Sequence, residues 1–144
     1  MIHYKTEEEI KLMKESCELA AEVLLMIEPY VKPGVTTERL NQICHDYIVA
    51  KGAVPSPLNY RGFPKSICSS VNEEICHGIP SDRKLRNGDI VNLDITTYLK
   101  GFHGDTSRTF FVGSPRKKAA KLVEVCKEAL QRGIQVVKPG AKLG

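Results

Sequence analysis

The chain has 144 residues, of which 42% are hydrophobic and 26% are charged, and its formal net charge is +4. The length fits one domain with a buried core, and the composition is that of an ordinary globular protein. Because the lysines and arginines are spread along the chain, the charge favours a solvated surface over nucleic-acid binding.

Five cysteines occur without a Cys-x-x-Cys spacing, which argues against a disulfide framework and against a zinc ribbon. The N-terminus lacks the basic and then apolar pattern of a secretory signal. No stretch approaches the roughly 18 apolar residues that a membrane-spanning helix needs. These features predict a cytoplasmic protein without a membrane segment.

The first predicted helix begins after Thr6, which forms a capping-box pattern with Glu9. Apolar residues then recur every three or four positions, as in an amphipathic helix. Pro29 and the turn at 32–34 end it. The apolar stripe consists of Ile10, Met13, Cys17, Ala20, Leu24 and Ile27.

A second helix is predicted from a cap at Thr36 or Thr37 to a stop at Gly52. Its apolar stripe includes Cys44. His45 lies beside this stripe, and we expect it to be a boundary residue rather than a ligand.

A third helix is predicted after the break at 113–115. Cysteines fall on the apolar faces of all three predicted helices, and we expect them to be reduced core residues. They are Cys17, Cys44 and Cys126.

Between the second and third helices, residues 53–64 contain three prolines and predict an irregular loop. A hairpin follows, with a strand at 66–71, a turn at Asn72-Glu73 and a return strand at 74–77. That two-residue turn pairs Cys68 with His77 and projects both side chains to one face. The alternative for His77 is a purely structural histidine.

Two aspartates stand in a second predicted hairpin at 89–112, whose strands are otherwise rich in Val, Ile, Thr and Phe. Lys100-Gly101 reads as its two-residue turn. Thr96 then faces Asp105, and Asp94 shares the same face, so the carboxylates are diagonal neighbours roughly 7–8 Å apart. Two such anions repel unless a cation lies between them, and a pair of divalent metal ions would fit. The alternative is a solvated polar face on an edge hairpin.

The runs PSPLNYRGFPKSICSSVNEEICHGIP (55–80) and NGDIVNLDITTYLKGFHGDTSRTFFVG (87–113) closely resemble those of the type I methionine aminopeptidases. The resemblance covers most of the chain from about Thr6 onward. It implies an α+β, pita-bread fold, in which two pseudo-symmetric halves surround a dinuclear metal site.

The resemblance also implies roles for individual residues. Asp94 and Asp105 would be two of five metal ligands, with Asp94 terminal and Asp105 bridging. His77 would be a catalytic and substrate-binding residue that donates a hydrogen bond to the substrate amide. The positions matching the pocket for the methionine side chain are Tyr60, Phe63 and Cys68. Pro57 stands where many bacterial members carry a cysteine, so this wall of the pocket is expected to differ.

The implied activity is removal of the initiator methionine from nascent proteins when the next residue is small. Two divalent ions, of cobalt, manganese, iron or zinc, are the implied cofactors. The implied partners are the N-terminus of a nascent polypeptide and the ribosome surface, without DNA. Two alternatives remain: a non-catalytic pita-bread binding module, and an X-Pro aminopeptidase or dipeptidase of the same fold.

The remaining ligands of the family, one His and two Glu, lie in its C-terminal half, and no histidine follows His103 here. A Val-Lys-Pro-Gly run follows the first helix at 31–34 and the third at 137–140, an offset of 106 residues. We therefore expect residues 1–144 to form an incomplete catalytic domain, with 1–113 as the first half and 114–144 as the start of the second. Alone, it should bind divalent metal weakly and show no peptidase activity.

Overall fold

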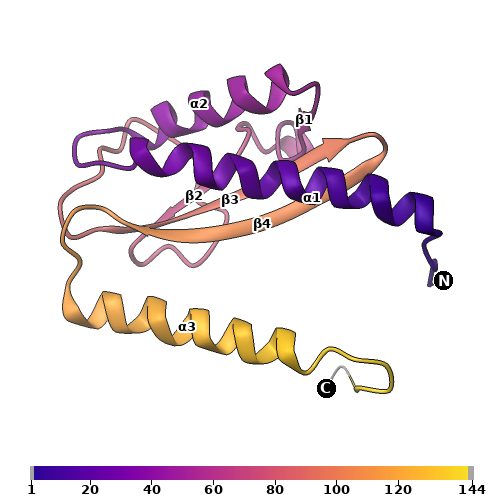
Figure 1. Ribbon diagram of the computed structural model, residues 1–144. Helices are drawn as coiled ribbons and strands as arrows, with labels where there is room; N and C mark the ends of the chain where they lie inside the picture. Colours follow the sequence, from indigo (N-terminus) through magenta and orange to yellow (C-terminus); the bar gives the residue numbers. More distant parts are fainter. Residues whose placement is uncertain (1, 143–144) are drawn as a thin grey trace.

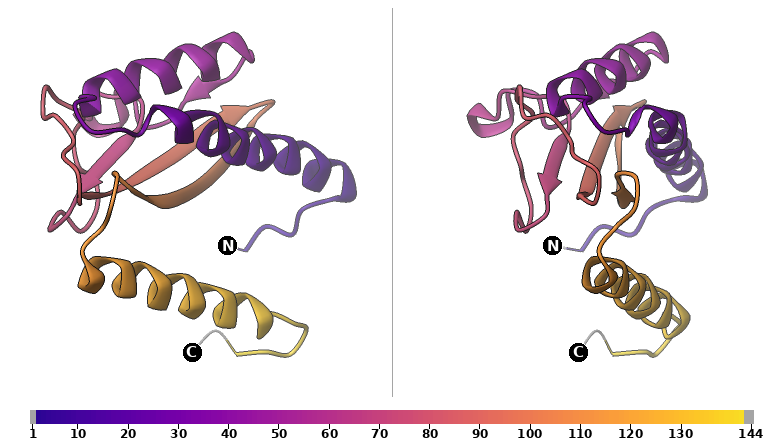
Figure 2. Two further views of the ribbon diagram at one scale, coloured as in Figure 1. Left: turned by 60° about the vertical axis from the view of Figure 1, so that its left-hand side comes forward. Right: turned by 90° about the vertical axis from the view of Figure 1, so that its left-hand side faces the viewer.

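The computed structural model describes residues 2–142, in which helices pack on one face of an antiparallel sheet (Figure 1). Helices α1 (Glu7–Ile27) and α2 (Thr37–Ala50) cover that face, while α3 (Lys117–Gln135) lies apart from the sheet (Figures 1 and 2). Among the described residues, no helix is both long and apolar enough to cross a lipid bilayer.

The central strand of the sheet is β3 (Ile90–Leu99), which pairs along its whole length with β4 (Phe102–Phe111). On its other side β3 pairs with β2 (Cys68–Val71) through residues 91–94 and with β1 (Val54–Pro55) through residues 97–98. All three pairings are antiparallel. Because of its three prolines, the segment 53–64 was predicted to be an irregular loop, but it contains the two-residue strand β1. A short edge strand tolerates proline.

Side chains of β3 alternate strictly between a core face and an open face. Val91, Leu93, Ile95 and Thr97 are fully buried beneath the helices, as a period of two requires. The helices contribute the facing apolar side chains, which are Leu19, Ala20, Val23, Leu24, Ile27, Leu40, Cys44 and Ile48. Apart from Thr97, the polar residues of β3 consequently point away from the helices.

Both predicted helix caps on this face are confirmed. The Thr6 side chain accepts a hydrogen bond from the Glu9 backbone, and the Glu9 carboxylate accepts one from the Thr6 backbone. Thr36, rather than Thr37, caps α2 by accepting from the Arg39 backbone. Each cap satisfies backbone N–H groups that the first helical turn leaves unpaired.

The contact between α1 and the sheet is polar at one point, and this makes the expectation for Cys17 wrong. Ser16 is fully buried and its Oγ lies 3.0 Å from Thr97 Oγ1, while Thr97 Oγ1 donates to the Ser16 carbonyl at 2.9 Å. Gly104 lets the helix backbone approach, since a Cβ there would lie 2.3 Å from the Ser16 carbonyl carbon. This contact turns Ser16 inward and leaves Cys17 exposed.

We expect Thr97→Val to lower the free energy of unfolding by about 1–3 kcal/mol, because it removes the buried hydroxyl that donates to the Ser16 carbonyl and leaves Ser16 Oγ with only the Thr97 backbone carbonyl. Urea unfolding would measure this. Thr106→Val, a partly buried neighbour on the same hairpin, is the matched control and should change stability by less than about 0.5 kcal/mol. Equal losses in the two variants would show that the Ser16–Thr97 contact contributes nothing specific.

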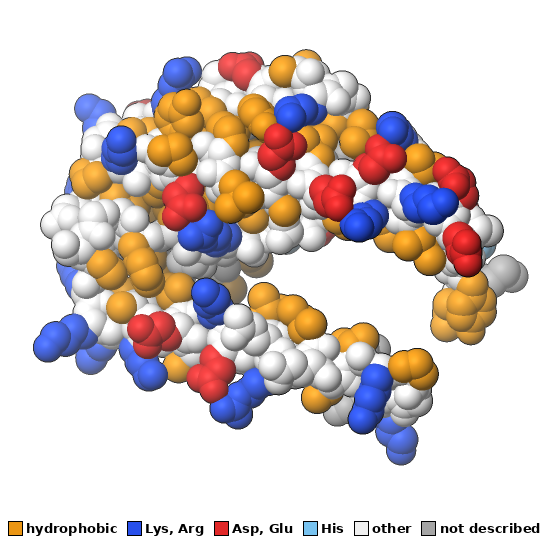
Figure 3. Space-filling view, viewed as in Figure 1, with side chains coloured by type: hydrophobic (Ala, Val, Ile, Leu, Met, Phe, Trp, Pro, Cys, Tyr) orange, Lys and Arg blue, Asp and Glu red, His pale blue; other side chains and the backbone are white. Residues whose placement is uncertain are grey.

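Helix α3 forms as predicted, but it buries no side chain between Lys117 and Gln135. Its apolar stripe, which includes Leu122, Val125 and Ile134, is exposed, and Figure 3 shows a hollow between α3 and the rest of the molecule. Cys126 on this helix is exposed too, so its expected core position is also wrong. Cys44 alone of the three helical cysteines is buried, with 0% exposure.

Candidate metal centre and substrate pocket

Asp94 and Asp105 lie where the predicted hairpin register places them. The turn at Lys100 and Gly101 has positive φ at both positions, 50° and 90°, as a two-residue hairpin turn requires. Thr96 pairs with Asp105, and Asp94 pairs with Ser107. Both carboxylates therefore stand on the open face of neighbouring strands, away from the helices.

The two carboxyl groups influence one another. Partial burial raises the pKa of Asp94, and the charge and hydrogen bonding of Asp105 raise it further, whereas His77 lowers it. A carboxyl whose pKa is raised in the folded protein stabilises the fold below its ordinary pKa, and this contribution is lost as the pH rises through the raised value. A cation shared by the two carboxylates would offset that loss.

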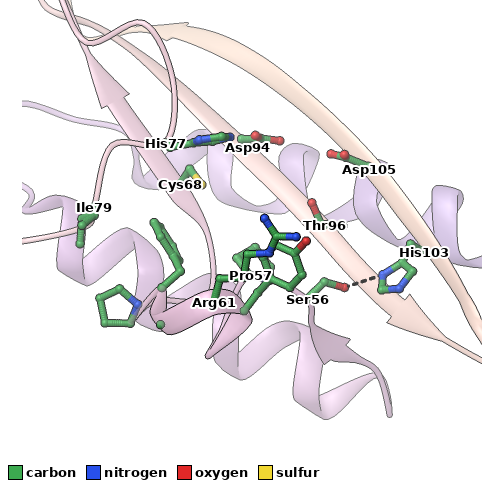
Figure 4. Close-up of a pocket in the computed structure, with 14 residues that line it drawn as sticks. Ser56, Pro57, Arg61, Cys68, His77, Ile79, Asp94, Thr96, His103 and Asp105 are labelled. Atoms are coloured by element: carbon green, nitrogen blue, oxygen red, sulfur yellow. Dashed lines mark hydrogen bonds between the residues drawn. The ribbon is translucent and has the colours of Figure 1, made fainter.

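A cavity of about 680 Å³ opens beside the carboxylates (Figure 4). Its lining includes every residue that the sequence assigned to a site. These residues are Tyr60, Phe63, Cys68, His77, Asp94 and Asp105. An apolar cavity with a few convergent polar groups is the usual form of a small-ligand site.

Cys68 reaches the cavity from β2, where it pairs with Asp94 across the sheet. The predicted cross-strand pairing of Cys68 with His77 is wrong, because residues 74–77 form no strand. The turn at Asn72 does form, with φ of 57° and a bond from the Glu74 N–H to the Val71 carbonyl, but no return strand follows. The Glu74 carboxylate instead accepts from the Val71 N–H, which takes a ladder donor away from a second strand.

His77 is held in the cavity by irregular backbone. Its φ is 56°, and the next residue, Gly78, accepts from the Ser69 N–H at 2.8 Å and donates to Ser70 Oγ at 3.1 Å. A Cβ on Gly78 would lie 2.2 Å from the Ser69 carbonyl oxygen. Glycine is thus required for this close approach, which carries the His77 imidazole to the Asp94 side of the cavity (Figure 4).

The opposite side of the cavity contains residues that the sequence did not assign to the site. Ser56 donates its backbone N–H to the Thr96 carbonyl, and its Oγ lies 2.9 Å from His103 Nδ1. The His103 ring also packs on Tyr98, with 4.8 Å between centroids. The hairpin register already placed His103 on the face of Asp105, and that was the available signal. Ser56 needed the pairing of β1 with β3, which the sequence did not predict.

The donor atoms present suit a divalent metal. Carboxylate oxygens are ligands for hard divalent ions, and a nearby imidazole extends the range to iron, cobalt and zinc. Within residues 2–142, no group of three or more His, Cys, Asp or Glu side chains is arranged to hold an ion. The two aspartates fit as part of a ligand set, as the sequence predicts.

We expect the thiols to differ sharply in reactivity. Burial raises the pKa of Cys44 to about 12, and burial with the charges of Asp94, Cys76 and Asp105 raises the pKa of Cys68 to about 11. Because the thiolate is the nucleophile, both should resist iodoacetamide at pH 8. Mass spectrometry should find label on the exposed thiols of Cys17, Cys76 and Cys126. Fast native labelling of Cys44 would contradict the packing of α2.

Comparison with known proteins gives a consistent result. Residues 11–144 match metallopeptidase family M24. The chain is 52% identical over 143 residues to a methionine aminopeptidase of Rickettsia prowazekii, which covers 99% of the chain and 55% of that relative. It is 53% identical over 144 residues to a methionine aminopeptidase of Escherichia coli, covering 99% of the chain and 54% of that relative. The chain thus spans about half the length of these curated relatives.

Solved structures agree with the architecture. The crystal structure of methionine aminopeptidase from Rickettsia prowazekii superposes with a TM-score of 0.98 at 52% identity, over 100% of this chain and 58% of that one. An Xaa-Pro dipeptidase from Bacillus anthracis gives a TM-score of 0.82 at 27% identity, over 95% of this chain and 37% of that one. These neighbours confirm the predicted α+β, pita-bread fold.

Proposed function

The chain belongs to metallopeptidase family M24, and from that membership we propose that it forms part of a metal-dependent aminopeptidase that removes N-terminal methionine when the next residue is small. The observation that carries the proposal is the position of Asp94 and Asp105 on one face of a hairpin, beside a cavity that also receives His77. The similarity to methionine aminopeptidases supports the choice of substrate.

Asp94 and Asp105 would supply two of the five ligands of a pair of divalent ions, drawn from cobalt, manganese, iron and zinc. When bound, such ions polarise a carbonyl group and lower the pKa of water. Partial burial of Asp94 between Cys68 and Ser107 fixes its position in the sheet, so the carboxylates are set by the strands rather than by a loop.

The remaining lining residues would bind and orient the substrate. Tyr60, Phe63 and Cys68 provide an apolar wall for an unbranched thioether side chain. Pro57 forms part of the same wall. Its fixed φ restricts the conformations that the backbone of this wall can adopt. The His77 imidazole, on the Asp94 side, would donate a hydrogen bond to the substrate amide.

We also propose that the natural substrate is the N-terminus of a nascent polypeptide in the cytoplasm. The ribosome surface would then be a weak partner. The net charge of +4 supports a modest attraction to ribosomal RNA, and this attraction should fall with ionic strength.

The test is a cleavage assay on the protein expressed from its complete open reading frame. Methionine release from Met-Ala-Ser should be lost after treatment with EDTA and restored by manganese or cobalt. Ala-Pro-Ser should not be cleaved. Preferential cleavage of Ala-Pro-Ser would favour an X-Pro peptidase instead, and metal binding without cleavage of either peptide would favour a binding module.

A further inference from the structure

The cavity is chemically asymmetric. Asp94, Asp105 and His77 line one side, the apolar residues form a wall, and the far side carries the cationic side chain of Arg61. Figure 4 shows the Arg61 guanidinium directed into the cavity, near Ser56 and the strand that carries Thr96. A ligand that fills the cavity would therefore meet anions at one end and a cation at the other.

The backbone holds Arg61 at this place in an uncommon conformation. Its φ and ψ are 48° and 35°, in the left-handed region, which residues other than glycine seldom adopt. The 3-10 turn Tyr60–Gly62 that contains it is closed by a bond from the Asn59 N–H to the Phe63 carbonyl at 2.8 Å and one from the Phe63 N–H to the Tyr60 carbonyl at 3.0 Å. Such strain persists where the surroundings fix it, and it is common at ligand sites.

The Arg61 guanidinium has N–H donors that are available to a ligand. Its carbon lies 5.5 Å from the centre of the Tyr60 ring, which orients it by a cation–π contact. Arg83, Arg108 and Arg132 each form an ion pair with a glutamate. In the part of the chain that the structure describes, Arg61 forms none. The planar fork of its N–H groups matches a carboxylate.

We propose that Arg61 binds a carboxylate of the substrate peptide that lies beyond the first two residues. This inference rests on the proposed function, in which the amino end of the peptide lies near Asp94 and Asp105 and the second residue is small. The carboxylate then belongs to an acidic side chain at the third position or to the C-terminus of a tripeptide. Arg61 is accordingly a specificity-determining residue.

The test compares peptides that differ only in this carboxylate, on the protein from its complete open reading frame. Met-Ala-Glu-amide carries the side-chain group, Met-Ala-Gln with a free C-terminus carries the terminal group, and Met-Ala-Gln-amide carries neither. We expect kcat/KM to be about three- to tenfold higher for one or both acidic peptides at low salt. The preference should fall toward one at 0.5 M salt, as for an exposed charge pair.

Three variants isolate the side chain. Arg61→Asn removes the charge with a residue that tolerates the left-handed region, and it should bring the ratio close to one. Arg61→Lys keeps a charge without the planar fork and should retain part of the preference. Arg39→Asn makes the same charge change on the exposed start of α2, away from the cavity, and should leave the ratio as it is in the unaltered protein.

Retention of the full preference in Arg61→Asn, or the absence of any preference in the unaltered protein, would overturn the inference. If both acidic and neutral peptides are cleaved at equal rates, the inference fails while the proposed function stands. If no peptide is cleaved, the proposed function fails, and the inference is decided by fluorescence anisotropy. There, the dissociation constants of labelled Met-Ala-Glu and Met-Ala-Gln peptides should show the same ratio and the same dependence on Arg61.

Discussion

The Asp105→Ala variant is expected to lose about a hundredfold or more of the proposed metal-dependent aminopeptidase activity, when made in the protein from its complete open reading frame. Loss of a residue that only supports a metal ligand lowers affinity or activity about 10–100-fold, so loss of ligand oxygens should lower it further. Asp105 lies on the open face of β4 and is exposed, so the fold should tolerate alanine there.

Two measurements check this expectation. Calorimetric titration with manganese should show weakened binding in Asp105→Ala, and Met-Ala-Ser cleavage should fall with it. The matched control is Asp82→Ala, an exposed carboxylate outside the cavity, which should behave like the unaltered protein. Unchanged metal binding in Asp105→Ala would remove Asp105 from the ligand set and would favour a solvated polar face on the hairpin.

Gly104→Ala should be the most destabilising single methyl addition on this hairpin. The new Cβ would lie 2.3 Å from the carbonyl carbon and oxygen of Ser16, which belong to a helix backbone and cannot rotate away. Overpacking in a core usually costs about 1–3 kcal/mol, and a clash with backbone belongs at the upper end of that range or beyond it. Urea unfolding should therefore show a loss of about 3 kcal/mol, or an insoluble protein.

Gly133→Ala provides the contrast. This glycine lies inside α3, and a Cβ there meets nothing within 4 Å. Alanine is the better helix former by roughly 0.5–1 kcal/mol, so far-ultraviolet circular dichroism should show equal or greater helicity. If Gly104→Ala were as harmless as Gly133→Ala, α1 would not approach the sheet as closely as its contact with Thr97 indicates.

Sequence patterns correctly predicted those parts of the fold that depend on residues close together in the chain. The register of the β3–β4 hairpin followed from a two-residue turn and a period of two, and the turn residues have the positive φ that this register needs. Thr6 and Glu9 likewise contain the whole of their capping box. Because both features depend on residues close in the chain, no tertiary knowledge was required.

The wrong predictions concern residues whose partners are distant in the chain. Cys17 falls on an apolar helical stripe, yet it is Ser16 that is buried. Ser16 contacts Thr97 and Gly104, which lie more than 80 residues away in the chain. Cys68 has no cross-strand partner at His77, because the Glu74 carboxylate takes the Val71 N–H and the segment after Asn72 stays irregular, while β3 pairs with the other edge of β2. Local pattern cannot weigh one distant partner against another.

The candidate site divides in the same way. The open face of Asp94 and Asp105 was predicted from the hairpin alone, whereas the roles of His77, Tyr60, Phe63 and Cys68 came from resemblance. Arg61 and Ser56 were not assigned, since they reach the cavity only when the 53–64 loop folds back on β3 through β1. The hairpin register placed His103 on the face of Asp105, but only the folded loop brings Ser56 to it.

The isolation of α3 has a consequence for the kinetics of local opening. In the 144-residue chain α3 buries no side chain, so its amide hydrogens should exchange with solvent at rates set by helix fraying, while those of β3 should exchange only when the whole sheet opens. The segment at 113–116, between β4 and α3, would then be the first point at which a protease cuts. The surviving core of this chain would still contain both aspartates, so we expect the carboxylate pair and α3 to open as separate cooperative units.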